Sequence, residues 1–276
     1  MQSPENDSTT GPPAEPPQAL AVPPRTLAPA WHTVVLIVGI LALSICGSSR
    51  LAGLHGSHGR LVTYATTALL ELVMLGWVAF GLRLRGIPLR SLLGAVSGGF
   101  HGVALDAGIA FAFWIGSLMI LGTLGILWSS AETALTHQQA ATRSGQPFAP
   151  SPSQQRTVRE LEQLAPANAE EIVSWVALCM LVGFVEESVF RGYLQGQFTA
   201  WARGGATVGV VFSALLFGAA HGYQGVRNMV LLAVFGALFS LLSIFRRSLR
   251  SCIFAHSWQD LVAGLALGFL RSHHVL

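Results

Sequence analysis

Residues 171–198 read EIVSWVALCMLVGFVEESVFRGYLQGQF, and this stretch decides the fold. A helix rises about 1.5 Å per residue, so roughly 20 mainly apolar residues cross the hydrocarbon layer of a membrane, and the stretch is long enough to do so. Two adjacent carboxylates and an arginine, Glu186, Glu187 and Arg191, interrupt it. Charges inside a membrane helix are costly and usually mark a functional site. The stretch therefore predicts a membrane span that carries a site.

Six other apolar stretches of comparable character accompany it, which predicts an all-α fold: a polytopic transmembrane helical bundle of about seven spans. The composition agrees, because 52% of the residues are hydrophobic and only 11% are charged, against about 25% charged in soluble domains. The expected spans cover residues 31–47, 61–82, 103–128, 171–198, 205–222, 226–245 and 252–270.

The chain divides into four predicted regions. Residues 1–30 hold most of the prolines together with Ser, Thr, Glu and Gln, a composition typical of a disordered tail. Residues 31–128 contain the first three helices. The polar stretch 129–168, rich in Gln, Ser, Pro and Glu, is expected to connect them to the remaining helices at 171–270.

All sixteen basic residues are arginines, and most of them flank apolar runs. Seven successive spans place three groups on one side, which the positive-inside rule makes cytoplasmic, together with the N-terminus. The groups are Arg83, Arg85 and Arg90; Arg203; and Arg246, Arg247 and Arg250. Because the arginines are not interleaved with aromatic residues, nucleic acid is not expected as a partner. The expected partner of the apolar helices is the lipid bilayer.

The charged residues of the stretch 171–198 differ in their expected partners. Glu187 and Arg191 are four residues apart, so they lie on one helical face and can neutralise each other. Glu186 points about 100° away and lacks that partner. The alternative interpretation is an interfacial charge cluster at the end of a helix.

Two histidines occur in similar spacings on later spans. Phe217 and His221 are four residues apart, as are His256 and Asp260. Taken alone, His221 could be a packing or interfacial residue, and Asp260 could simply orient His256. Three helices that each present an ionisable group to the interior of a bundle favour a shared functional site.

These motifs, E-E-x-x-x-R, F-x-x-x-H and H-x-x-x-N/D, occur in order on separate predicted helices, over residues 171–265. In this respect the sequence resembles the CAAX-protease and bacteriocin-processing (CPBP) family. This family includes the type II CAAX prenyl endopeptidases and lysostaphin-resistance-like proteins. The resemblance implies an intramembrane glutamic endopeptidase whose catalytic helices lie at 171–270, in the cell membrane of a bacterium.

The resemblance also implies roles for individual residues. Glu186 and His221 would position and deprotonate the attacking water, while His256 and Asp260 would stabilise the oxyanion. Glu187, Arg191 and Phe217 would support them. No cofactor and no metal are expected, and the implied partner is a peptide or protein substrate at the membrane. The sequence departs from the prenyl endopeptidases at Asp260, where they carry Asn, because an Asp side chain donates a hydrogen bond only when protonated.

Three other functions fit the same residues. A zinc-dependent membrane protease could use Glu186, Glu187, His221 and His256 as ligands, although no H-E-x-x-H motif is present. A proton-coupled transporter could use a relay that includes Glu71, an acid with no partner motif, which is otherwise expected to be a structural or cavity residue. A non-catalytic scaffold or bacteriocin-immunity protein could keep the family fold without turnover.

A catalytic site also makes a geometric demand. Glu186, His221, His256 and Asp260 should surround one cavity that opens toward the arginine-rich side. Straight helices of equal length would hold these groups at different depths. Two alternatives follow: either the expected boundaries are wrong by several residues, or the fifth helix is short and sunk and ends at Gly222 and Gly225 inside a polar cavity.

Overall fold

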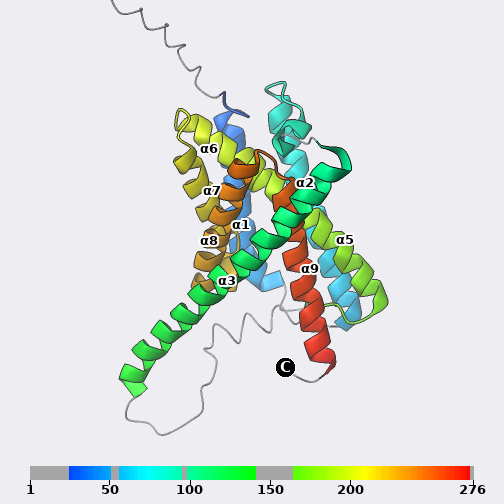
Figure 1. The fold of residues 1–276 in the computed structure, drawn as a ribbon, viewed down its shortest axis with the longest axis vertical. Coiled ribbons are helices and arrows are strands. Elements are labelled where there is room, and N and C mark those ends of the chain that lie inside the picture. Colours follow the sequence, from blue (N-terminus) through cyan, green and yellow to red (C-terminus); the bar gives the residue numbers. More distant parts are fainter. Residues whose placement is uncertain (1–24, 51–55, 95–97, 141–163, 274–276) are drawn as a thin grey trace, which may run out of the picture.

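The computed structural model describes residues 25–50, 56–94, 98–140 and 164–273. In this part of the chain the secondary structure is helical apart from one isolated bridge between Gly94 and Ser248, so the all-α prediction is confirmed. Figure 1 shows the helices gathered into one bundle. They are α1 (Ala30–Arg50), α2 (Gly56–Arg83), η2 (Leu89–Leu93), α3 (Gly99–Ala140), α5 (Ala169–Glu186), η3 (Glu187–Leu194), α6 (Gln195–Trp201), α7 (Ala206–Ala220), η4 (Gly222–Gln224), α8 (Val226–Arg246) and α9 (Arg250–Ser272).

Each of the seven predicted spans corresponds to a helix. Five helical segments in the described residues are long and apolar enough to cross a membrane, namely Gly59–Arg83, Gly99–Leu135, Ala169–Trp201, Val226–Arg246 and Arg250–Ser272. Two apolar helices are shorter, Ala30–Cys46 and Ala206–Ala220. The protein is therefore an integral membrane protein whose fifth predicted span, α7, is short.

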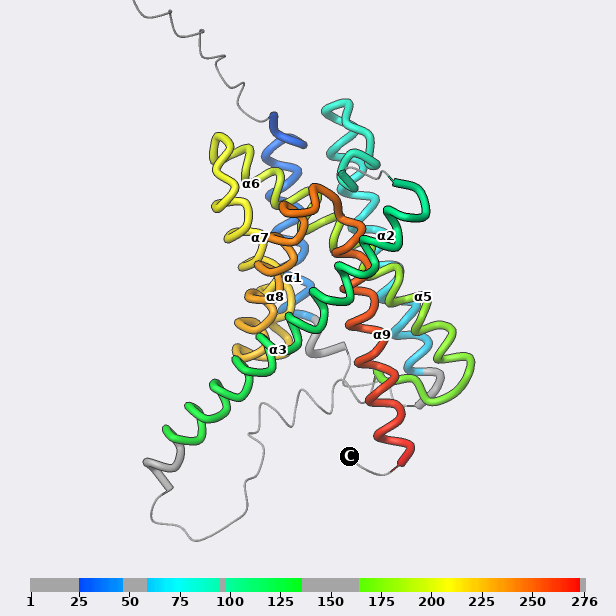
Figure 2. The backbone as a smooth tube through the Cα atoms, in the orientation of Figure 1, coloured from blue at the N-terminus to red at the C-terminus, as the bar shows by residue number. Residues whose placement is uncertain are grey.

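Helix α3 is longer than the sequence suggested. It runs to Ala140, whereas residue 128 was expected to be its end. The added residues contain neither Gly nor Pro and consist mainly of Ala, Ser, Thr and Gln, so nothing in them stops the helix. In Figure 2 the lower end of α3 extends beyond the neighbouring helices. Residues 1–24 of the predicted tail and residues 141–163 of the predicted connection at 129–168 lie outside the described residues, whereas Leu27 and Ala28 near the end of the tail donate to Gln197.

The three helix ends and turns that carry the arginine groups lie at one end of the bundle. The C-terminal end of α2, the turn between α6 and α7, and the turn between α8 and α9 lie at the same end of the bundle (Figure 1). The backbone amide of Leu249 donates to the carbonyl of Leu93, which ties two of these turns. At this end Asp106 of α3 accepts hydrogen bonds from Arg246, Arg250 and Ser251. That the arginine-rich end is cytoplasmic stays a prediction.

Small residues let the helices that carry the motifs approach closely. A Cβ atom at Gly183 of α5 would lie 2.4 Å from the Ser257 hydroxyl of α9. A Cβ atom at Gly218 of α7 would lie 2.4 Å from the Met229 carbonyl of α8. Membrane helices commonly pack through such positions, because small side chains let the backbones come close. The contacts bring α5, α7, α8 and α9 around a shared interior.

Candidate active site

The adjacent acids Glu186 and Glu187 lie where α-helical winding changes to π-helical winding. Helix α5 ends at Glu186, and the chain continues without a break into the π-helical segment η3, Glu187–Leu194, and then into α6. Single π-helical turns inside α-helices are rare and are frequent at functional sites. The sequence analysis assumed ordinary α-helical winding and did not predict this segment.

Glu187 and Arg191 form a buried ion pair. Arg191 Nη1 lies 3.1 Å from Glu187 Oε1, and both side chains are fully shielded from solvent. The guanidinium carbon of Arg191 also lies 4.2 Å from the centre of the Phe217 ring, which adds a cation–π contact from α7. The arginine therefore compensates the charge of Glu187 and links η3 to α7.

Glu187 has a second partner that the sequence analysis missed. The Nδ1 atom of His256 on α9 lies 2.8 Å from Glu187 Oε1. Since Glu187 is paired with Arg191, it is a carboxylate and accepts, so the imidazole carries a proton on Nδ1 and donates it. This hydrogen bond joins residues that are far apart in the sequence, so the spacing of residues within one helix could not predict it.

The other ring nitrogen of His256 faces the two remaining acids. His256 Nε2 lies 3.7 Å from Glu186 Oε2 and 3.6 Å from Asp260 Oδ2. Both distances exceed a direct hydrogen bond and are in the range that a bridging water spans. The structure thus brings Glu186, His256 and Asp260 together around the Nε2 atom.

Phe217 and His221 form the edge of this cluster. Phe217 is buried, and its ring centre lies 4.9 Å from that of His221 and 6.2 Å from that of His256. His221 ends α7 and donates from Nδ1 to the Phe217 carbonyl at 2.9 Å. The Phe217 ring therefore lies next to both histidines, His221 at the end of α7 and His256 on α9.

The members of the cluster differ in exposure. The side chains of Glu186 and Asp260 are 14% and 34% exposed, whereas those of Glu187 and His256 are 0% and 6% exposed. His221 is also partly exposed. Solvent therefore reaches Glu186, Asp260 and His221 more readily than the inner pair of Glu187 and His256.

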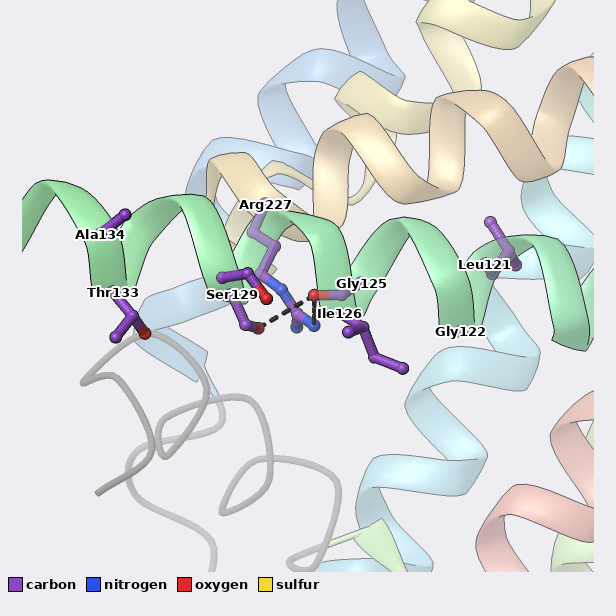
Figure 3. Close-up of a pocket in the computed structure, with 9 residues that line it drawn as sticks. Leu121, Gly122, Gly125, Ile126, Ser129, Thr133, Ala134 and Arg227 are labelled. Atoms are coloured by element: carbon purple, nitrogen blue, oxygen red, sulfur yellow. Dashed lines mark hydrogen bonds between the residues drawn. The ribbon is translucent and has the colours of Figure 1, made fainter. Parts of the chain in front are cut away.

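A separate pocket lies further along α3. Figure 3 shows its lining side chains, which come from α3 between Leu121 and Ala134 and from Arg227 at the start of α8. It has a volume of about 650 Å³, and Arg227 Nη2 lies 3.4 Å from the Gly125 carbonyl inside it. Its lining includes none of the clustered acids and histidines, so it is not their access route. The predicted cavity toward the arginine-rich side stays a prediction.

A metal centre has little support in the arrangement of side chains. In the ranges that the structure describes, no group of three or more His, Cys, Asp or Glu side chains is arranged to hold a metal ion. Glu187, one of the potential ligands, is already engaged by Arg191 and His256.

Glu71 is a further buried acid in the bundle. It lies on α2, which packs against α5 and η3, and it is 9% exposed. The only signal in the sequence was an acid in the middle of an apolar span.

The fold and the cluster define a class: a polytopic helical membrane protein with carboxylates and histidines from α5, η3, α7 and α9 gathered in its interior. A family model described as type II CAAX prenyl endopeptidase Rce1-like matches residues 168–262. The match covers about a third of the chain and contains every motif residue from Glu186 to Asp260. It confirms the resemblance to the CAAX-protease family over this part of the chain, which is similar to type II CAAX prenyl endopeptidases. Comparisons with curated proteins and with solved structures gave no significant match.

Proposed function

We propose that the protein is an intramembrane endopeptidase that hydrolyses peptide bonds near the membrane surface through a water activated by Glu186 and His221. The observation that carries this proposal is the convergence of Glu186 and Asp260 on His256 Nε2, at 3.7 and 3.6 Å. The substrate is a peptide or protein that reaches the cluster from the membrane. The protein lies in the cell membrane of a bacterium, with its N-terminus in the cytoplasm.

Glu186 is the general base. Its neighbour Glu187 is held by Arg191 and His256 through Oε1 and is fully buried, whereas the side chain of Glu186 is partly exposed. Glu186 Oε2 is shielded and has no hydrogen-bond partner among the described residues. A carboxylate with an unused acceptor can take a proton from water as the water attacks the carbonyl carbon.

His256 stabilises the oxyanion. Because its Nδ1 donates to Glu187, its Nε2 can donate as well only when the ring is an imidazolium. The carboxylate of Glu187 lies on the other side of the ring and compensates that charge. A donor prepared in a site with little water stabilises the developing negative charge strongly. Asp260 adds a second donor when it is protonated.

His221 assists at the edge of the site. Its Nδ1 is occupied by the Phe217 carbonyl, which leaves Nε2 to orient the water beside Glu186 or to pass a proton to the leaving amine. Its ring packs on Phe217, which also lies next to His256, and this placement supports the role.

The proposal can be tested with a substitution that removes the carboxylate of Glu186 and keeps the size of its side chain. Glu186→Gln should lower turnover by at least about a hundredfold, since general bases contribute roughly that much or more, with little change in thermal stability. Mass spectrometry of the membrane proteome, with wild type against this variant, should show substrate termini that disappear. Glu170→Gln, an exposed acid in the first turn of α5, is the matched control. Full turnover by purified Glu186→Gln would contradict the assignment.

Three outcomes would favour the other candidate functions. A phenotype that survives Glu186→Gln would favour the scaffold or immunity protein. Stoichiometric zinc, with activity lost on chelation and restored by zinc, would favour the metalloprotease. Proton-coupled uptake into liposomes would favour the transporter.

A further inference from the structure

Helix α8 packs against α7, α9 and η3 but contributes no acid and no histidine to the site. It contributes Phe235 and Phe239, which are one helical turn apart and 5% and 1% exposed. Their rings pack edge to face, with centres 4.6 Å apart. Phe113 of α3 makes a second edge-to-face contact with Phe239, at 4.9 Å. The Phe239 ring is therefore buried and held in one orientation.

Phe239 lies beside both Arg191 and His256. The guanidinium carbon of Arg191 lies 5.2 Å from the centre of the Phe239 ring, and the centre of the His256 ring lies 5.7 Å from it. The thiol of Cys252, one turn before His256 on α9, donates to the Phe239 carbonyl at 3.6 Å and so ties α9 to α8. A cation within about 6 Å of a ring centre is attracted by the negative face of the ring. Phe239 is therefore placed to stabilise charges on η3 and on α9.

The two basic groups share a single carboxylate oxygen. Arg191 Nη1 and His256 Nδ1 lie 3.1 and 2.8 Å from the same atom, Glu187 Oε1. When His256 is an imidazolium, two cations therefore face one buried carboxylate, and each cation disfavours the charge of the other. Salt and water screen such a buried repulsion only weakly. A further source of stabilisation for the imidazolium is therefore needed.

The groups that face His256 come from the elements around it. They are Glu186 at the end of α5, Glu187 and Arg191 on η3, Phe217 with His221 beyond it on α7, Phe235 and Phe239 on α8, and Asp260 on α9 itself. The buried acid of α3, Asp106, is bound to Arg246 and Arg250 at the arginine-rich end. Glu186 and Asp260 are partly exposed, so water screens their charges more than that of Glu187. Of the three phenylalanine rings, Phe239 alone lies within about 6 Å of both Arg191 and His256.

We propose that Phe239 is a positioning residue of the site, whose ring face stabilises the Arg191 guanidinium and the His256 imidazolium together and so keeps His256 Nε2 a hydrogen-bond donor. The role rests on the proposed function, in which this Nε2 atom stabilises the oxyanion. Phe239 acts through His256 and does not touch the reacting atoms. The interaction is electrostatic, so it depends on the electron density of the ring face and not only on the volume of the side chain.

Fluorinated phenylalanines at position 239 separate these two properties. Each added fluorine withdraws electron density from the ring face and changes the shape of the ring little. The measurement is nitrogen NMR of the full-length protein in detergent, isotopically labelled at histidine, which distinguishes imidazolium from neutral imidazole without any substrate. The His256 signal is identified by its loss in His256→Asn. With Phe239 it should be that of an imidazolium at neutral pH. With trifluorophenylalanine the change to the neutral form should occur about one pH unit lower, because the cation has lost part of its stabilisation.

Turnover should follow the same series. It is measured on a substrate found in the proteome comparison with Glu186→Gln. It should fall stepwise with each fluorine, by about tenfold at the trifluoro derivative, and the fall of the rate at alkaline pH should begin at a lower pH. The same replacement at Phe198 is the matched control, because the ring contacts of Phe198 are with Trp201 and Phe212. It should change neither the rate nor the NMR signal.

A pair of leucine variants compares two buried rings of the same helix. Phe239→Leu should lower turnover at least about tenfold, whereas Phe235→Leu, which removes a ring 6.5 Å from His256, should lower it much less. Equal losses in the two leucine variants, or a fluorine series that leaves the His256 titration unchanged, would overturn the proposal even if cleavage depends on Glu186. A His256 titration that follows the series in a protein without peptidase activity would contradict the proposed function and support the role of the Phe239 ring.

Discussion

At the scale of single residues, the adjacent acids Glu186 and Glu187 differ because their partners differ. Glu187 is paired with Arg191 and also accepts from His256, so it holds the ring and compensates its charge. Glu186 is partly exposed and lies beside the Nε2 atom of that ring. Chemically identical side chains, one residue apart, are therefore suited to structural support and to catalysis respectively.

Asp260 is the residue at which this chain departs from the prenyl endopeptidases, and its role is testable. We expect Asp260→Asn to preserve turnover if Asp260 acts as a neutral donor. A donor that must stay protonated makes the rate fall as the pH rises through its titration, and the amide donates at every pH, so the variant should lose that fall. The pH–rate profile of the purified variant measures this.

The opposite outcome has a clear meaning. Asp260 lies 3.6 Å from His256 Nε2, so as a carboxylate it could orient the imidazolium. The Asn variant would then lose turnover through loss of charge, as happens when an Asp that holds a catalytic histidine is replaced. A folded variant that binds substrate and is inactive at every pH would establish that second role.

At the scale of helices, the site depends on how closely α5 approaches α9. Gly183 faces Ser257, the neighbour of His256, and an added Cβ would lie 2.4 Å from its hydroxyl and 3.0 Å from its amide nitrogen. We expect Gly183→Ala to push the helices apart, at a cost of about 1–3 kcal/mol for overpacking. It should also weaken the hydrogen bond between His256 and Glu187, so turnover should fall. Thermal denaturation and activity in detergent are the measurements.

Gly116→Ala in α3 provides the matched control. A Cβ atom at Gly116 would meet nothing within 4 Å. The change should be neutral or slightly stabilising, because Ala is a better helix former than Gly by about 0.5–1 kcal/mol. Equal effects of the two variants would show that the contact between α5 and α9 does not determine the geometry of the site.

At the scale of the whole molecule, the orientation in the membrane can be tested with two cysteines. Ser91 of η2 and Ser272 of α9 are exposed and lie toward opposite ends of the bundle. In a Cys46→Ser background, Ser272→Cys should react with a membrane-impermeant thiol reagent in intact cells, and Ser91→Cys only after permeabilisation. The positive-inside rule predicts this result, and the reverse labelling pattern would show that the arginine-rich end is outside.

Much of the architecture was predictable because it depends on local properties of the chain. The length and polarity of each apolar run determine a span, and all seven predicted runs are helices. The spacing of four between Glu187 and Arg191, and between His256 and Asp260, places each pair on one face of one helix, and both pairs are close in the structure. The short α7 agrees with one of the two alternatives that the sequence left open for the fifth span, since this helix ends at Ala220.

The sequence by itself therefore determined the membrane class, the spans and the pairs of residues within single helices, because helical periodicity and the thickness of a membrane act on every chain alike. The tertiary structure alone decided which helices face one another. It paired Glu187 with His256 and Asp106 with Arg246. These contacts depend on the rotation and depth at which helices pack. Close approaches between helices, such as that of Gly183 to Ser257, set this rotation and depth. The spacing of residues within one helix does not encode such approaches.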